Sequence, residues 1–278
     1  MKLRRRKAAA LLLAVFAVAA VFLGWRMLNP PEPVYGGKPL SAWAQQYGSN
    51  FWTHNKSSAD EAALAIWQIG ADALPFLLRW TDARDSSLKK KLRATVSGKW
   101  HDRLGLRDKS AELRRLGAHG FHALGTNAAP AAQALIEIAT RHPDEDGRYV
   151  AVFGLRKLAP VGEPVTPFLI QCLTNSESTI RDEAAIAFGG MRDRPQFVVP
   201  ILIQYLQFAK TSPHSFECSD TVNLLWFFGT NAKAATPILL ELLNHSSAEV
   251  RHQVTNALPE IDAEAAAKAR VKRPGQAP

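Results

Sequence analysis

The feature that most constrains this 278-residue chain is a short helical motif that recurs along it. Each copy opens a helix, continues with three apolar residues and has a polar residue at its fifth position. The copies begin at Pro75, Gln133, Pro167, Pro200 and Pro237, so successive starts are 58, 34, 33 and 37 residues apart. A period of this length is typical of helical repeat proteins. Proline suits the first helical turn because its missing N–H would have no partner there. Each copy is therefore predicted to be the second helix of a repeat.

A different kind of segment, richer in alanine and other small residues, precedes each of these helices. Four of these segments have a glycine near their end: Gly70, Gly125, Gly190 and Gly229. Glycine adopts φ > 0 without steric cost, as the residue after a helix often must. The stretch GTNAKAATP, 229–237, is therefore predicted to be the turn within a repeat, which ends one helix at glycine and starts the next near proline.

Helix pairs of this length cannot bury their apolar faces alone, so successive pairs must stack around a continuous core. The predicted fold is all-α, an α-solenoid of about five to six antiparallel helix pairs over 59–261. The segments 178–191 and 248–261 also place an apolar residue before arginine, at Ile180-Arg181 and Val250-Arg251. With the glycine-to-proline turns, they make the chain resemble the HEAT-repeat family, including the HEAT-like repeats named from phycobilisome lyases. The resemblance implies the fold and no particular activity, because its motif consists of packing and turn residues.

The repeat pattern is interrupted in two places. An insertion near 80–111 separates the first two second helices, and it carries many charges together with Trp100. A further insertion is predicted at 208–220, after which Asn223 stands where the family has arginine. Insertions in solenoids form loops, often on a functional face.

The segment 29–58 is predicted to be a Pro-rich linker followed by a capping helix. Its helical part has one apolar stripe, formed by Leu40, Trp43, Ala44 and Tyr47. A terminal repeat needs such a cap because it otherwise exposes its stacking face. A helix that binds close to the membrane is the alternative.

Residues 1–28 are predicted to be a signal anchor, a single transmembrane helix. Five basic residues precede an uncharged apolar run over 8–25, which is just long enough to cross a bilayer core of about 30 Å. The positive-inside rule keeps the basic end in the cytoplasm and places the repeats on the exported side of the cytoplasmic membrane. The alternative is a signal peptide cleaved after the small residues at 17–19, which would leave a secreted or periplasmic protein.

The formal net charge of +9 comes from the two ends of the chain. Six basic residues lie in the first 28 positions and four in the basic C-terminal tail, 262–278, which leaves 24 basic against 25 acidic residues for 29–266. A body without an overall positive field is not expected to bind nucleic acid.

The sequence contains none of the motifs that would indicate a catalytic or cofactor site. It lacks the His-Glu dipeptides from which some HEAT-repeat enzymes build di-iron sites, and it has no nucleophile elbow or phosphate-binding loop. His119 and His122 could share a helix face, but a zinc site needs further ligands. No catalytic residue, cofactor, metal or small-molecule substrate is predicted. Cys172 and Cys218 could pair, although nothing in the sequence places them together.

The polar fifth position of the second helices is the strongest indication of a binding surface. The residues that occupy it are Arg79, Glu137, Gln171, Gln204 and Glu241. They are predicted to project from equivalent places along one face, where their mixed charges favour a protein or peptide partner. The simpler interpretation is that every amphipathic helix needs a solvated position. The expected function is a membrane-anchored, non-catalytic scaffold. The alternative is an enzyme or enzyme-maturation factor of the bilin-lyase-like class.

Overall fold

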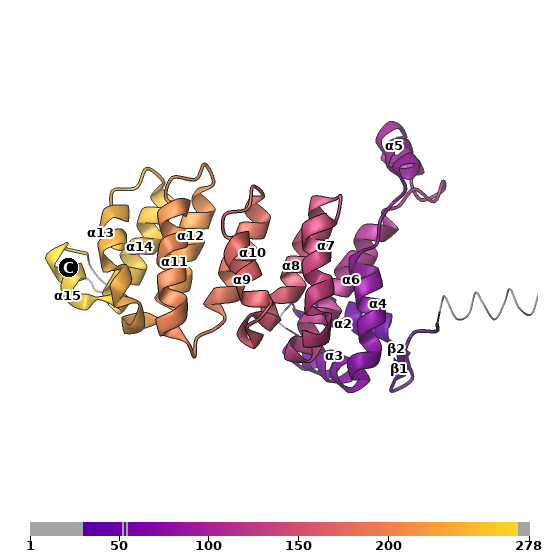
Figure 1. Ribbon diagram of the computed structural model, residues 1–278. Helices are drawn as coiled ribbons and strands as arrows, with labels where there is room; N and C mark the ends of the chain where they lie inside the picture. Colours follow the sequence, from indigo (N-terminus) through magenta and orange to yellow (C-terminus); the bar gives the residue numbers. More distant parts are fainter. Residues whose placement is uncertain (1–29, 52, 54, 272–278) are drawn as a thin grey trace, which may run out of the picture.

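The computed structural model describes residues 30–51, 53 and 55–271, and it shows an all-α solenoid (Figure 1). The predicted anchor, 1–28, and the last part of the predicted tail lie outside the described residues. Helices stack from one end of the array to the other, with the start of the described chain and the C-terminal helix at opposite ends (Figure 1).

The α-helices of the described residues form six successive pairs, and two further helices stand outside the pairs: α2, which precedes them, and α5, which lies in the first insertion. The first helices of the pairs are α3 (Lys56–Ile69), α6 (Lys109–Leu124), α8 (Glu145–Leu155), α10 (Ser178–Gly189), α12 (Ser215–Trp226) and α14 (Ala248–Ile261). The second helices are α4 (Leu74–Thr81), α7 (Ala132–Arg141), α9 (Val165–Cys172), α11 (Pro195–Ala209), α13 (Thr236–Leu242) and α15 (Ala263–Lys268). The number of pairs agrees with the predicted solenoid.

One continuous hydrophobic core runs through all six pairs. It begins with Leu40, before the first pair, and reaches Ala266 in α15 without a break. Small residues allow neighbouring helices to approach closely. At Gly117 of α6, an added Cβ atom would lie 3.0 Å from the backbone oxygen of Leu77 in α4. Because each pair buries its apolar faces against its neighbours, the array has to fold as a stack.

The predicted glycine turns are present in three of the four expected places. Gly70, Gly125 and Gly229 have φ of 62°, 57° and 52°, and each opens a 3₁₀ turn that leads to a second helix: η1 (Gly70–Ala73), η3 (Gly125–Ala131) and η5 (Gly229–Ala235). Gly190 has φ −75°, so the prediction of a left-handed residue is wrong there. In the third pair the turn is η4 (Arg156–Val161), which begins without a glycine.

The prediction that Pro200 heads a helix is also wrong. α11 begins five residues earlier, at Pro195, and Pro200 lies inside it. The missing N–H of Pro200 leaves the carbonyl of Gln196 without its usual partner. This loss falls near the first turn, where the helix can tolerate it, so α11 continues to Ala209 and becomes the longest of the second helices.

The segment before the repeats contains a small hairpin where the sequence predicted a Pro-rich linker. β1 (Val34–Tyr35) pairs antiparallel with β2 (Lys38–Pro39). Gly36 and Gly37 form the turn, with φ of 55° and 77°, as a tight two-residue hairpin requires.

The helix that follows, α2 (Leu40–Phe51), packs on both α3 and α6. Its buried residues are Leu40, Trp43, Ala44, Tyr47 and Gly48, so the apolar stripe faces the array.

The two insertions differ from the expected loops. Within the first, α5 (Ser87–Thr95) and a 3₁₀ turn, η2 (Gly98–Trp100), stand away from the stack (Figure 1). The second is largely helical, because α12 already begins at Ser215. Counted from the helix start, the position of Arg181 in α10 corresponds to Cys218, and Asn223 lies in the middle of α12.

The C-terminal segment that was predicted to be a basic tail begins with an ordered helix. The Asp262 carboxylate accepts a hydrogen bond from the Ala265 backbone N–H at 3.1 Å and caps α15. Ala266 of this helix is buried, and Val271 packs against the core. α15 therefore serves as the second helix of the sixth pair.

Among the described residues, Lys56–Thr81 alone is long and apolar enough to cross a membrane. It comprises α3, η1 and α4, with left-handed Gly70 between the two helices. Its apolar residues Ile66, Leu77 and Trp80 are buried in the protein core, so it forms the first helix pair of the solenoid.

Candidate functional site

The five predicted binding residues all lie on second helices, and all are exposed. They are Arg79 on α4, Glu137 on α7, Gln171 on α9, Gln204 on α11 and Glu241 on α13. Two of them have side-chain contacts that restrain them. The Arg79 guanidinium lies 5.1 Å from the centre of the Phe76 ring, and the Glu241 carboxylate forms an ion pair with Lys210 at 2.8 Å.

A cavity of about 240 Å³ between α9 and α11 brings two of these residues together. We call it the α9–α11 groove, and it is lined by Ile170, Gln171, Leu173, Thr174, Ile201, Gln204, Tyr205 and Phe208. Gln171 and Gln204 carry amides that can both donate and accept hydrogen bonds. Ile170 and Phe208 are 41% and 42% exposed. The groove therefore offers an apolar surface flanked by two amides.

A buried ion pair supports the inner side of the groove. Arg181 of α10 donates to the Glu217 carboxylate of α12, whose side chain is fully buried, and the Arg181 guanidinium also lies 5.5 Å from the centre of the Phe208 ring. Cation–π contact of this kind holds an aromatic ring in place. Arg181 thus holds the Phe208 ring in position, and part of the Phe208 side chain remains accessible to a partner.

Arg181 belongs to a series of arginines on the first helices that join consecutive repeats. Its members are Arg114, Arg148, Arg181 and Arg251. The last three donate to a backbone carbonyl of the loop before their own helix, at His142, Asn175 and His245 respectively. Arg114 donates to the carbonyl of Ala83, which lies just after the preceding second helix, α4. We call this series the arginine ladder.

Three members of the ladder also reach a carboxylate of the next repeat. Arg114 binds Asp146 at 2.7 Å, Arg148 binds Glu177, and Arg181 binds Glu217. The sequence motif identified Arg181 and Arg251 but not these acidic partners, because the partners occupy different positions in their own repeats. The ladder is interrupted at α12, where Cys218 stands at the arginine position, and continues with Arg251 on α14.

The first helices beside the Arg181–Glu217 pair carry a cluster of carboxylates with perturbed titration. The pKa of Asp182 is raised to about 7, chiefly by burial and then by the neighbouring charges of Asp220, Glu183 and Glu217, against the opposing effect of Arg181. Burial likewise raises the pKa values of Glu183 and Asp220. Such shifts occur at functional sites and in structural charge clusters alike.

The raised pKa of Asp182 predicts that stability falls as pH rises. The folded state keeps a proton between about pH 4 and pH 7 that the unfolded state releases, so the free energy of unfolding decreases across this window. We expect Asp182→Asn to abolish most of this dependence and to raise the unfolding free energy at pH 8 by about 1–2 kcal/mol, less than the shift alone implies because the carboxylate is partly solvated.

Chemical denaturation of both proteins at pH 5 and pH 8 measures this effect. Asp193→Asn, at an exposed site, is the control. Equal stabilisation by Asp182→Asn at both pH values would contradict the assignment.

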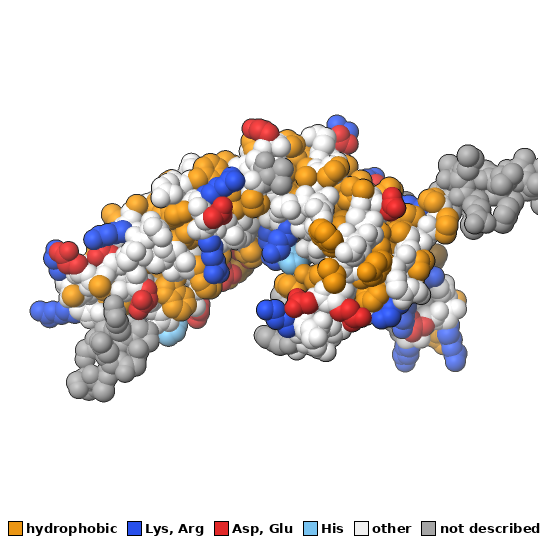
Figure 2. Space-filling model, turned by 90° about the horizontal axis from the view of Figure 1, so that it is seen from below, with side chains coloured by type: hydrophobic (Ala, Val, Ile, Leu, Met, Phe, Trp, Pro, Cys, Tyr) orange, Lys and Arg blue, Asp and Glu red, His pale blue; other side chains and the backbone are white. Residues whose placement is uncertain are grey.

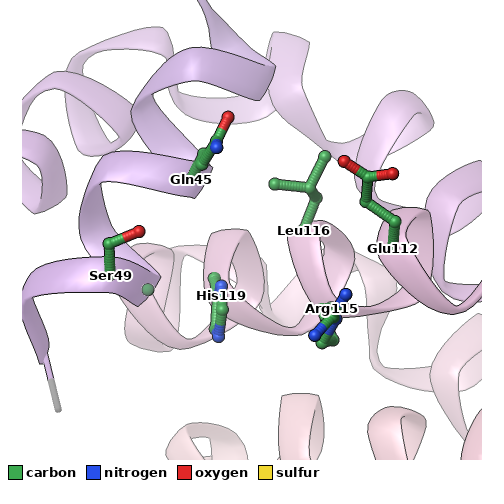
Figure 3. Close-up of a pocket in the computed structure, with 7 residues that line it drawn as sticks. Gln45, Ser49, Glu112, Arg115, Leu116 and His119 are labelled. Atoms are coloured by element: carbon green, nitrogen blue, oxygen red, sulfur yellow. The ribbon is translucent and has the colours of Figure 1, made fainter.

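A second pocket, of about 270 Å³, lies between α2 and α6. Gln45 and Ser49 line it from α2, opposite a row of α6 side chains made up of Glu112, Arg115, Leu116 and His119 (Figure 3). Burial and then Arg115 lower the pKa of His119. Charges of both signs face this pocket, and both charged side chains are exposed.

His122, one turn from His119, is a core residue. Its Nδ1 lies 2.7 Å from the Tyr47 hydroxyl, and its Nε2 lies 3.2 Å from the Arg156 guanidinium. Burial, followed by the charges of Lys157 and Arg156, lowers its pKa to about 3. Because arginine can only donate, the neutral ring accepts at Nε2 and donates from Nδ1 to Tyr47.

The histidines therefore serve to attach α2 to the array. Within the ranges that the structure describes, no three His, Cys, Asp or Glu side chains are grouped so as to hold a metal ion. Cys172 and Cys218 are both buried and free, so the pairing that the sequence left open does not occur here.

The surface seen from below carries acidic and basic side chains interspersed with hydrophobic ones, and a hollow interrupts it (Figure 2). Neither sign of charge dominates this face. This pattern agrees with the near balance of 24 basic and 25 acidic residues in 29–266.

Comparison with known proteins finds no matching protein-family model and no matching curated protein. Several solved structures are similar. One is an engineered protein, Northeast Structural Genomics Consortium target OR329, at 18% identity over 81% of this chain and 96% of that chain, with a TM-score of 0.43. Another is a designed armadillo repeat protein in complex with the peptide (KR)4, at 14% identity over 81% and 100% of the two chains, with a TM-score of 0.44.

A third is the engineered protein of target OR366, at 18% identity over 81% and 99%, with a TM-score of 0.42. At these identities and TM-scores the similarity says nothing about what the chain binds. The assignment of the fold rests on the helix packing described above.

Proposed function

We propose that this protein is a non-catalytic scaffold that binds a peptide or protein segment along its second helices and is held at the exported side of the cytoplasmic membrane by residues 1–28. The observation that carries the binding proposal is the α9–α11 groove, where Gln171 and Gln204 flank an apolar surface. The basic and apolar pattern of 1–28 supports the anchor. The repeat type and the turn motifs support membership of the HEAT-like class.

The groove suits an extended segment with one apolar side chain. Two glutamine amides on neighbouring helices can pair with the backbone N–H and C=O groups of an extended peptide, while Ile170 and Phe208 receive an aliphatic or aromatic side chain. Aromatic side chains in well-packed positions dominate interface energies. Phe208 is such a residue, because Arg181 fixes its ring from the inner side.

Site-specific photo-crosslinking in living cells tests this proposal. A photoreactive amino acid at Gln171 and, separately, at Gln204 is expected to capture the same partner. The matched control is His252, exposed on the first helix α14. Adducts at His252 that equal those at the groove, or no adduct at either glutamine, would contradict the proposal.

Phe208→Ala is expected to reduce capture at both glutamines. Loss of a central aromatic anchor weakens an interface by about 2 kcal/mol or more, roughly thirtyfold in affinity. Phe197→Ala removes an aromatic side chain of similar exposure, 43%, from outside the groove lining and should leave capture unchanged.

The membrane topology is tested separately. A labelling enzyme fused after Pro278 should tag exported proteins, and tagging of cytoplasmic proteins would contradict the proposed topology.

A further inference from the structure

Within the first insertion, whose residues 84–108 we call the insertion, the helix α5 exposes its apolar face, unlike a helix that packs on a protein core. On α5, Leu88 is 68% and Leu92 43% exposed, and no residue of the helix is buried. The charged side of α5 instead faces the array, because Lys90 pairs with Asp144 beside α8. Lys89 and Arg93 pair with Asp85, just before α5, and Asp85 in turn accepts a hydrogen bond from Ser110 of α6 at 2.7 Å. These ion pairs fix α5 with its apolar side outward.

The remainder of the insertion exposes further apolar side chains. Trp100 is 48% and Leu104 57% exposed, and the Arg103 guanidinium lies 5.3 Å from the Trp100 ring. We call Leu88, Leu92, Trp100 and Leu104, together with Lys91, Lys99 and Arg103, the insertion surface. Lys91 and Lys99 form no ion pair within the described residues. Apolar side chains among free basic groups are therefore presented to solvent.

Charge and position indicate what covers this surface. The insertion holds eight basic and three acidic residues, whereas the rest of 29–266 holds 16 basic and 22 acidic residues. In Figure 1, α5 lies at the same end of the array as β1 and β2, where the described chain begins. The predicted anchor directly precedes that point in the sequence.

We propose that the insertion surface contacts the anionic lipid headgroups of the membrane in which the chain is anchored. Leucine and tryptophan enter the interfacial region, where tryptophan is favoured, while lysine and arginine pair with anionic headgroups. Together with the anchor, this second contact orients the array relative to the membrane. The inference rests on the proposed anchor.

Fluorescence of the full chain reconstituted in vesicles tests the contact. An environment-sensitive label is placed on Leu92→Cys, and on Leu64→Cys as the control, because Leu64 is also an exposed leucine, at 58%. Cys172 and Cys218 are buried and do not compete for the label. In vesicles containing phosphatidylglycerol, the label at position 92 is expected to shift to the blue and to be quenched by a lipid-attached quencher, while the label at position 64 is not.

Reversing the charge of basic residues on the insertion surface tests whether they attract the surface to anionic headgroups. Lys91→Glu with Lys99→Glu is expected to abolish the shift at position 92, and Lys56→Glu, at an exposed lysine on α3, to leave it unchanged. In vesicles of phosphatidylcholine alone the shift should be largely lost.

The possible outcomes distinguish failure of the proposed membrane contact from failure of the proposed anchor. A chain that floats with vesicles while position 92 stays unquenched retains the anchor and overturns the contact. A chain that does not float overturns both. A response of the position 92 label to a single-stranded oligonucleotide, with none to anionic vesicles, would assign the surface to nucleic acid and overturn the membrane contact.

Discussion

Replacing Glu217 with alanine is expected to lower the free energy of unfolding by about 3–5 kcal/mol, the usual cost of removing one partner from a buried ion pair. The Glu217 side chain is fully buried and the Arg181 side chain is 7% exposed. Without the carboxylate, the Arg181 guanidinium keeps its bonds to the carbonyls of Asn175 and Ser176 but retains an uncompensated charge inside the protein.

Denaturant unfolding followed by circular dichroism measures this loss. The matched control is Glu241→Ala, which removes the acid of an exposed pair with Lys210 whose carboxylate is 58% exposed. Exposed pairs contribute about 0–1 kcal/mol. If the two variants lost the same stability, the Arg181–Glu217 pair could not be a principal support of the array.

Replacing Gly117 with alanine is expected to cost about 2–3 kcal/mol, although alanine is the better helix former by about 1 kcal/mol. The new Cβ atom would lie 2.4 Å from the Thr81 hydroxyl oxygen, 2.9 Å from the Thr81 backbone nitrogen and 3.0 Å from the Leu77 backbone oxygen. Two of these atoms belong to the backbone of α4, so the helices themselves must separate.

Thermal unfolding of Gly117→Ala should show a clear decrease in melting temperature. Gly98→Ala provides the comparison, because an added Cβ atom there meets nothing within 4 Å, and it should change the unfolding free energy by no more than about 0.5 kcal/mol. An unchanged melting temperature for Gly117→Ala would mean that α4 and α6 do not require this close approach.

The solenoid could be predicted from the sequence because its signals are local. Glycine at Gly70, Gly125 and Gly229 and proline at Pro75 and Pro237 act on the backbone within a turn or two, wherever the rest of the chain lies. The same local rule failed at Pro200, which lies inside α11 and not at its start. The sequence pattern around a proline does not distinguish these two positions. The start of α12 was missed because the irregular length of its repeat hid it.

The residues of the candidate site could be predicted from the sequence only in part. The periodic polar position identified Gln171 and Gln204, and the structure places both at one groove. Phe208 could not be identified, since its exposure depends on where α11 ends and on Arg181 from another helix. The outward orientation of α5 likewise depends on the ion pair between Lys90 and Asp144, which lie 54 residues apart along the chain.

The arginine ladder has a geometrical consequence for the opposite side of the array. Three of its arginines pair with a carboxylate of the next repeat, and each pair fixes the distance and rotation between one first helix and the next. In a solenoid these two quantities set the curvature of the array. Curvature in turn sets how far apart the second helices stand. The separation of α9 and α11 is therefore determined partly by the Arg181–Glu217 pair on the neighbouring layer, so that the width of the groove depends on a bond that no bound segment would touch.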